Sequence, residues 1–187
     1  MALQHAILGF LSFEPMTGYD LKTRCFDKSV KYFWSADQAQ IYRTLEKLQQ
    51  EGHITSETQV QEGKPNRKIY HITPTGQSTL LQWLKEPQEL PIQKEPFLMQ
   101  LYFSNGLSNE DILKQVRYQK QQHCARLREY LMIRDHFEKG LKQPLDPQHQ
   151  RATALQYLTL KFGMGLEELY LKWLDEAEAV VQTLQEA

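Results

Sequence analysis

Hydrophobic residues recur at helical spacing in four segments near the start of the chain, and polar or proline-containing stretches separate them. The predicted helices cover residues 2–12, 17–27, 35–51 and 73–86. Thr17 and Asp20 are three positions apart, which is the spacing of a capping box at a helix start. Ser35 and Gln38 repeat this spacing before the third helix, and Gly52 suits its end.

Two short segments between the third and fourth helices predict a β-hairpin. Residues 53–60 and 68–73 are rich in β-branched and aromatic residues, and the polar stretch 63–66 suits the hairpin tip. Thr73 followed by Pro74 then suits the start of the fourth helix. Three helices, a hairpin and a further helix are the order of a winged helix-turn-helix.

The pattern changes at a proline-rich stretch. Residues 87–96 contain three prolines and are predicted to link a winged helix-turn-helix domain, residues 1–86, to a helical domain, residues 97–187. We therefore predict a mainly α fold with a small β-hairpin, in which an N-terminal winged helix-turn-helix precedes a C-terminal dimerisation domain of long antiparallel helices.

Beyond the linker the pattern is entirely helical. An apolar segment, 97–103, precedes two long predicted helices, 108–141 and 148–185, which a turn between Pro144 and Pro147 joins. A hairpin of two helices cannot bury both apolar faces by itself, so a second copy is expected to cover them in a C2 homodimer. The residues predicted for this dimer interface are Leu113, Val116, Leu127, Leu131, Phe162, Leu166, Leu169, Trp173 and Val180.

Composition adds limits to this picture. Hydrophobic residues make up 41% of the chain and charged residues 24%, with a net charge of −1. No apolar run is long enough to span a bilayer, and no basic region precedes the apolar N-terminal stretch, so neither a membrane partner nor a signal peptide is expected. The two cysteines, Cys25 and Cys124, lie far apart, which favours a reducing cytoplasm over a disulfide framework.

The third predicted helix carries candidate DNA contacts. Ile41, Leu45 and Leu48 set its buried side, so residues near its N-terminal end on the other sides are free to reach DNA. Glu46 shares the outward face and would repel phosphate, which predicts insertion by the first two turns only. The candidate contacts are Gln38, Gln40, Tyr42 and Arg43 on this helix and Lys64, Arg67 and Lys68 on the hairpin.

Other function classes compete with DNA binding to different degrees. The near-neutral charge and Glu46 leave open a protein-interaction scaffold, in which the winged helix no longer contacts DNA. No acid, base and nucleophile can be assembled, and the six histidines lack metal-ligand spacing, so no enzyme activity, metal or cofactor is predicted. Gly163 and Gly165 are explained by close helix packing rather than phosphate binding.

Two features admit a regulatory role beside a plainer one. Cys124 suits a redox or ligand sensor, but a small buried hydrophobe accounts for it more simply. A set of aromatic and other apolar residues suits an effector pocket between the two domains, although such spacing is more often core. The set comprises Phe97, Met99, Tyr102, Phe103, Tyr157, Phe162 and Trp173.

Several stretches resemble a known family. AILGFLSFEPMTGYDLK (6–22), IYRTLEKLQQEGHI (41–54) and GKPNRKIYHITPTGQSTL (63–80) resemble the opening, recognition helix and wing of PadR-type transcriptional regulators. EPFLMQLYFSNGLS (95–108) and EELYLKWLDEA (167–177) resemble the longer, virulence-activator-like branch, which has a large helical C-terminal domain.

The resemblance implies a specific function. PadR-type proteins are homodimers, usually repressors and sometimes activators, that bind double-stranded DNA at inverted-repeat operators. By this resemblance Tyr42 corresponds to the family's DNA-contacting tyrosine, and Lys64, Arg67 and Lys68 correspond to its basic wing. A small-molecule effector or a partner protein that changes the geometry of the helical arms is a further expectation.

Overall fold

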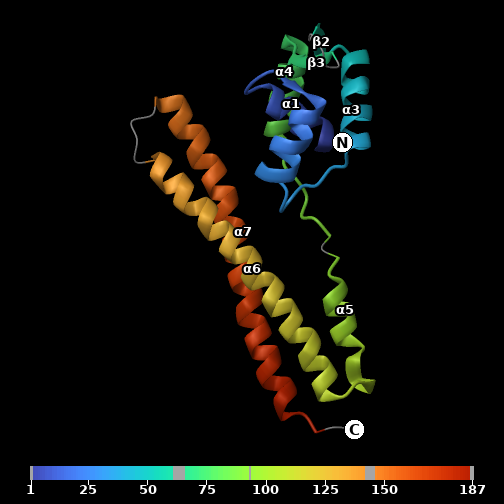
Figure 1. Ribbon diagram of the computed structural model, residues 1–187, viewed down its shortest axis with the longest axis vertical. Coiled ribbons are helices and arrows are strands. Elements are labelled where there is room, and N and C mark those ends of the chain that lie inside the picture. Colours follow the sequence, from blue (N-terminus) through green and yellow to red (C-terminus); the bar gives the residue numbers. More distant parts are fainter. Residues whose placement is uncertain (1, 61–65, 93, 142–145, 186–187) are drawn as a thin grey trace. The chain divides into compact units, whose positions relative to one another are not determined.

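A computed structural model describes residues 2–60, 66–92, 94–141 and 146–185 of the 187-residue chain (Figure 1). The chain divides into two compact units, residues 1–91 and residues 92–187. We call them the N-terminal unit and the helical unit, and each is described by itself.

The N-terminal unit has the predicted order of elements with one additional strand. Its elements are α1 (Ala2–Leu11), β1 (Met16–Thr17), α2 (Gly18–Asp20), the π-helix η1 (Leu21–Ser29), α3 (Gln38–Gln50), β2 (Ile54–Gln59), β3 (Arg67–Ile72) and α4 (Pro74–Lys85). The hairpin pairs β2 with β3 in antiparallel register, from Ile54 opposite Ile72 to Gln59 opposite Arg67. Strand β1 pairs with the other edge of β3, which gives the sheet order β1-β3-β2.

Helix caps explain where the elements of this unit begin. Thr17 and Asp20 form the predicted capping box, and the Thr73 hydroxyl accepts a hydrogen bond from the Gly76 N–H at the start of α4. The predicted cap at Ser35 is wrong, because α3 begins two residues later. Its N-cap is Asp37, whose carboxylate has two acceptor oxygens for the free N–H groups of the first turn.

The core of the N-terminal unit is continuous. Apolar side chains from α1, η1, α3 and the sheet pack together and leave the other side of α3 facing outward. The buried members are Ile7, Leu8, Leu11, Met16, Leu21, Cys25, Phe26, Ala36, Ile41, Leu45, Leu48, Ile54, Tyr70 and Leu80. Ile41, Leu45 and Leu48 are the residues that the periodicity of α3 predicts for its buried face.

The helical unit consists of α5 (Pro96–Tyr102), the 3-10 turn η2 (Ser104–Gly106), α6 (Asn109–Leu141) and α7 (Pro147–Thr183). Asp146 is the N-cap of α7, one residue before the helix itself. Helices α6 and α7 lie side by side (Figure 1). A small core joins them to α5, and its buried members are Phe97, Ile112, Val116, Leu174 and Val181. The predicted class, mainly α with a winged helix and long C-terminal helices, is confirmed.

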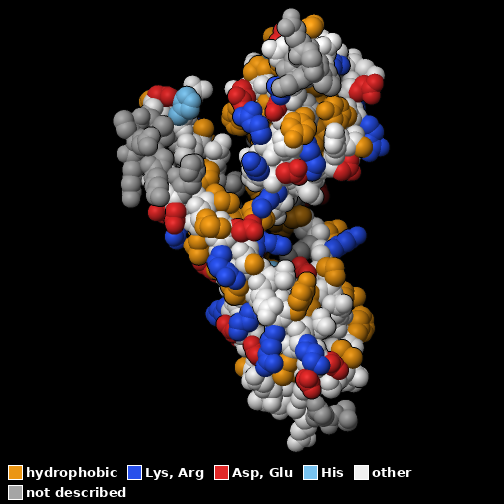
Figure 2. All heavy atoms as spheres, viewed as in Figure 1, with side chains coloured by type: hydrophobic (Ala, Val, Ile, Leu, Met, Phe, Trp, Pro, Cys, Tyr) orange, Lys and Arg blue, Asp and Glu red, His pale blue; other side chains and the backbone are white. Residues whose placement is uncertain are grey.

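Much of the apolar surface of the helical unit is uncovered. Along α7 the exposed large apolar residues include Leu155, Leu158, Phe162, Leu169 and Val180. Figure 2 shows exposed hydrophobic side chains among charged ones on this unit. Across the ranges that the structure describes, no helix combines the length and apolar character needed to cross a bilayer.

Candidate nucleic-acid interface

The outward face of α3 presents the predicted DNA contacts. Gln38, Gln40, Tyr42 and Arg43 are all exposed, and Glu46 lies on the same side one turn further along. The Arg43 Nε donates to the Ala39 carbonyl at 3.3 Å, so one of its N–H groups is used within the helix. The two terminal nitrogens of this guanidinium carry the donors suited to a guanine edge or a phosphate.

Gln40 has a structural role that the sequence did not reveal. Its side-chain oxygen accepts a hydrogen bond from the Asp37 N–H at 3.1 Å, and its own N–H donates to Asp37 Oδ1 at 2.7 Å. This reciprocal pair is a capping box at the start of α3. One lone pair of the Gln40 oxygen is therefore engaged, and the NH₂ group of Gln40 supplies two donors for a base contact.

Tyr42 lies on the backbone of Gly18. A Cβ atom added at Gly18 would stand 2.7 Å from both Cε1 and Cζ of the Tyr42 ring, so only glycine allows this approach. The other side of the tyrosine stays open, and 42% of the residue is exposed. Burial raises the pKa of the neighbouring Tyr70, and Tyr42 and Glu46 raise it further. Tyr42 therefore packs against Gly18 and keeps a side that is accessible to a ligand.

Strand β3 carries two of the three basic residues predicted for the wing, Arg67 and Lys68. Lys68 is exposed, with its Nζ 5.2 Å from the centroid of the Tyr70 ring. Arg67 is also exposed, and its NH2 nitrogen lies 3.6 Å from Asp20 Oδ2. Lys64, the third predicted wing contact, lies outside the described residues.

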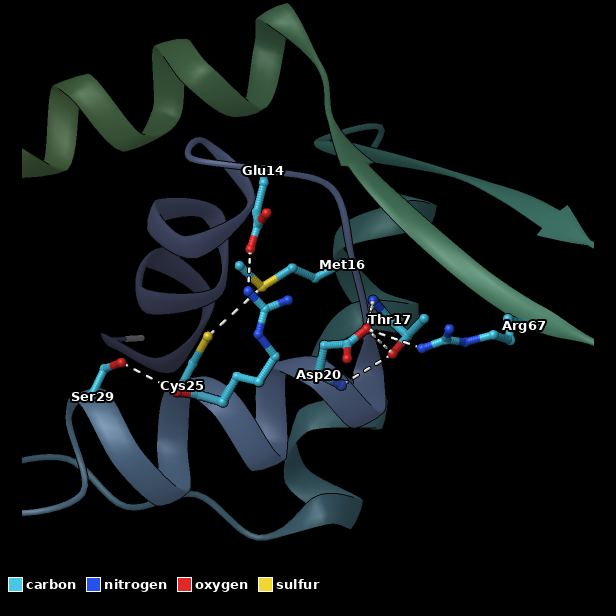
Figure 3. Close-up of polar contacts among 8 residues, drawn as sticks. Glu14, Met16, Thr17, Asp20, Cys25, Ser29 and Arg67 are labelled. Carbon is cyan, nitrogen blue, oxygen red and sulfur yellow. Dashed lines mark hydrogen bonds and ion pairs between the residues drawn. The ribbon is translucent and has the colours of Figure 1, made fainter. Parts of the chain in front are cut away.

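Asp20 connects the wing cation to the capping box of α2 (Figure 3). Its Oδ2 accepts hydrogen bonds from the Thr17 hydroxyl at 2.6 Å and the Thr17 N–H at 3.2 Å. Burial favours a higher pKa for this carboxyl, but the hydrogen bonds from Thr17 and the charges of Arg67 and Arg24 bring the pKa below its ordinary value. Asp20 is therefore ionised at neutral pH and attracts Arg67.

Sequence reasoning missed the part that Gly18 and Asp20 take in this surface. The capping pattern of Thr17 and Asp20 was visible, but their proximity to Tyr42 and Arg67 depends on tertiary packing. Tyr19, between them in the sequence, is exposed. The one local signal was a glycine at the first position of α2, where helix propensity alone gives no reason for it.

The predicted dimer residues fall into three groups within the helical unit. Val116 is fully buried in the core of its own chain, and Leu113 and Trp173 pack partly against that core. Leu127, Leu131 and Leu166 are half-buried. Phe162, Leu169 and Val180 are exposed.

The aromatic set proposed as an effector pocket is also divided. Phe97 is buried against Trp173, with ring centroids 6.0 Å apart, whereas Tyr102 and Phe103 are exposed. Trp173 borders an open apolar hollow of about 400 Å³ in the helical unit. Within the residues that the structure describes, no three His, Cys, Asp or Glu side chains gather as a metal site.

Comparison with known proteins covers nearly the whole chain. Residues 7–82 match the transcriptional regulator PadR-like family, and residues 93–182 match the virulence activator alpha C-terminal family. The negative transcriptional regulator PadR of Bacillus subtilis is 32% identical over 180 residues, which cover 96% of this chain and 97% of that protein.

Solved structures agree with this assignment. The crystal structure of B. subtilis PadR in complex with operator DNA is 29% identical, with a TM-score of 0.83 over 97% of this chain and 99% of that chain. PadR has also been solved with p-coumaric acid, at a TM-score of 0.76, 31% identity, and 97% and 99% coverage. The Vibrio cholerae virulence activator AphA has a TM-score of 0.74 and 30% identity over 98% of this chain and 99% of its own. The protein belongs to the PadR-like family of transcriptional regulators.

Proposed function

We propose that this protein is a homodimeric repressor that binds an inverted-repeat operator, with α3 in the major groove and the β2–β3 hairpin on the neighbouring backbone. The observation that carries the proposal is the exposure of Tyr42 and Arg43 together on the first half of a capped α3. Arginine can read guanine through two hydrogen bonds, and a tyrosine hydroxyl can donate to phosphate. Lys68 on the adjacent strand adds a cation for the phosphate backbone.

The uncovered apolar face of α7 supports the proposed homodimer. Leu155, Leu158, Phe162 and Leu169 are exposed at spacings of three, four and seven, which place them on one side of the helix. A second copy brings the same face and buries it around a twofold axis. Two recognition helices are then expected in successive major grooves, about 34 Å apart.

The sign of regulation and the effector are proposed from the relatives. B. subtilis PadR is a negative regulator and has been solved both with operator DNA and with p-coumaric acid. We extend to this chain a repressor role in the cytoplasm and release from DNA by a small-molecule effector, for which p-coumaric acid is the first compound to test. AphA is a virulence activator, so a reporter fused to the regulated promoter decides the sign.

The proposal is tested by fluorescence anisotropy with the protein's own promoter fragment and a scrambled duplex at two salt concentrations. We expect preference for the promoter, and affinity that falls as salt rises because bound cations release counterions. Tyr42→Ala is expected to weaken promoter binding about tenfold or more, and Lys68→Glu is expected to weaken binding to both duplexes.

Lys85→Glu is the matched control for Lys68→Glu. It makes the same charge change at an exposed lysine of α4, which packs against α1, and is expected to leave affinity nearly unchanged. Failure of the wild-type protein to bind either duplex at both salts would instead favour a protein-interaction scaffold. The exposed Glu46 on the outward face of α3 is the observation behind that alternative.

A further inference from the structure

We propose that the Thr17–Asp20 turn positions two DNA-contacting side chains from different elements, Tyr42 of α3 and Arg67 of β3. In this inference Gly18 and Asp20 are positioning residues: Gly18 sets the place of the Tyr42 ring, and Asp20 sets the place of the Arg67 guanidinium. The inference rests on the proposed DNA binding and names the residues that prepare the surface for it.

The turn is held at both ends. Thr17 belongs to β1 and lies opposite Ile69 of β3, so its backbone is part of the sheet. The Asp20 N–H donates to Thr17 Oγ1 at 3.0 Å, and the Thr17 N–H donates back to Asp20 Oδ2 at 3.2 Å. Leu21, directly after the turn, is fully buried in the core. Gly18 therefore lies on a backbone segment with little freedom to move away from a neighbour.

The contact of Gly18 with Tyr42 leaves no room for a side chain. The nearest ring atoms would be 2.7 Å from a Cβ at Gly18, which is well inside van der Waals contact. The ring belongs to a tyrosine in the first half of α3, the part of the helix proposed to enter the major groove, where a tyrosine hydroxyl can donate to a phosphate. The backbone of Gly18 thus contacts the Tyr42 ring and limits where the ring and its hydroxyl can lie.

Asp20 acts on Arg67 through charge. The same Oδ2 that accepts both Thr17 hydrogen bonds is 3.6 Å from Arg67 NH2, so rotation of the carboxylate would cost the cap. The Arg67 side chain is 46% exposed, and its guanidinium has five N–H donors in a fixed fork. One side of the fork can face Asp20 while the other binds a phosphate, which reduces the freedom lost on binding.

The first experiment is a double-mutant cycle on operator affinity with the full-length protein. Gly18→Ala is expected to weaken binding about tenfold when Tyr42 is present, since the added methyl group displaces the ring. In a Tyr42→Ala background the space is vacant, and the same substitution should change affinity less than about twofold. Equal losses in both backgrounds would overturn the role of Gly18.

A second cycle tests Asp20 independently. Asp20→Asn keeps an oxygen for the Thr17 N–H but removes the charge that attracts Arg67. We expect it to weaken binding by several-fold and to reduce the salt slope by about one, because Arg67 then no longer neutralises its phosphate. Arg67→Gln is expected to have the same effect, and Asp20→Asn should add nothing further in the Arg67→Gln background. Tighter binding by Asp20→Asn would overturn this role, because Asp20 would then only repel phosphate.

Failure of the inference and failure of the proposed function give different results. If the wild-type protein does not bind its operator, the DNA-binding proposal fails. If it binds, and both substitutions weaken binding regardless of Tyr42 and Arg67, DNA binding stands and the positioning role fails. Thermal unfolding of each variant identifies loss of fold, and that loss would not reproduce the dependence on Tyr42 or on the salt slope.

Discussion

The two units of this protein differ in how much of their apolar surface is buried within one chain. Fourteen buried apolar residues from helices and sheet form the core of the N-terminal unit. The helical unit has two helices of 33 and 37 residues, yet among its described residues five buried ones form the core that joins them to α5. The N-terminal unit closes its core within one chain, whereas the helical unit leaves large apolar residues exposed along α7.

The polar contacts of the two units also have different roles. In the N-terminal unit they cap helices and fix side chains at the candidate DNA surface, as Asp20 and Asp37 do. In the helical unit they join α6 to α7: Arg117 Nε donates to Glu178 at 2.8 Å, and His123 Nδ1 lies 2.5 Å from the buried Glu167. The exposed Arg117–Glu178 pair contributes little stability, so apolar burial has to provide most of the stability of the helical unit.

The largest expected effect comes from placing a charge on the open face of α7. Leu169→Glu should weaken the dimer about a hundredfold or more, because a C2 interface contains the leucine twice and the carboxylate loses its hydration. Sedimentation velocity over a dilution series measures this change. Operator affinity should fall with it, since one recognition helix makes half of the contacts.

Leu81→Glu is the control for that substitution. Leu81 of α4 is 57% exposed and Leu169 is 62% exposed, so the two changes are alike apart from the unit in which they lie. Leu81→Glu is expected to leave the dimer intact. A dimer that tolerates Leu169→Glu would place the interface elsewhere and weaken the contrast between the units.

Two buried leucines offer a direct comparison of the cores. Leu45 and Leu174 are both fully buried, one in each unit, and either change to alanine should cost about 2–5 kcal/mol. The loss at Leu45 should be independent of protein concentration, whereas the helical unit should become less stable on dilution if the proposed dimer stabilises it. Hydrogen exchange of peptides from each unit, at two concentrations, separates the two responses. Concentration-independent exchange in both units would contradict the comparison.

The sequence predicted the parts of the fold that depend on local chemistry. Thr17 with Asp20, and Thr73 with Pro74, indicate their helices because cap and first turn are adjacent in the chain. Strand β1 was missed because two residues carry no periodicity, and only pairing with β3 makes them a strand. The start of α3 was misplaced because Ser35 and Asp37 both suit an N-cap.

The candidate site was only partly accessible to the same reasoning. Helical periodicity separated Tyr42 and Arg43 from the buried face of α3, since burial along one helix follows a fixed period. The Gly18–Tyr42 contact joins residues far apart in the sequence, and no local pattern marks it. In the long helices, apolar residues occur on more than one side, so periodicity could not separate the buried Val116 from the exposed Phe162.

A smaller effect distinguishes two glycines of α7. A Cβ at Gly163 would lie 2.8 Å from the Tyr130 ring of α6, whereas Gly165 has no neighbour within 4 Å. Gly163→Ala should therefore lower the free energy of unfolding by about 1–3 kcal/mol through overpacking. Gly165→Ala should raise the free energy of unfolding by about 0.5–1 kcal/mol because alanine favours the helix. Thermal unfolding measures both, and a destabilising Gly165→Ala would favour close packing of a second copy against Gly165 in the proposed dimer.

The smallest effect concerns the two thiols, one in each unit, and leaves the fold unchanged. Burial raises the pKa of Cys25 to about 11, against the opposing charge of Arg24, and the carboxylates of Glu14 and Asp20 add to the rise. Its thiol, 3.7 Å from the Met16 sulfur (Figure 3), should stay unmodified by iodoacetamide at about pH 8 because little thiolate forms. Cys124 of α6 is half-buried in the single chain and should react first, as mass spectrometry of the labelled peptides would show.

The same shift predicts how the N-terminal unit responds to alkali. A thiol whose pKa is higher in the folded state contributes its full stability below the ordinary pKa of about 9, and that contribution declines as pH rises toward about 11. Cys25→Ala should remove this alkaline loss, while Cys124→Ser should leave it unchanged. Rapid labelling of Cys25 at neutral pH would show that the core of the N-terminal unit opens readily, and the contrast with the helical unit would then lie in oligomeric contacts alone.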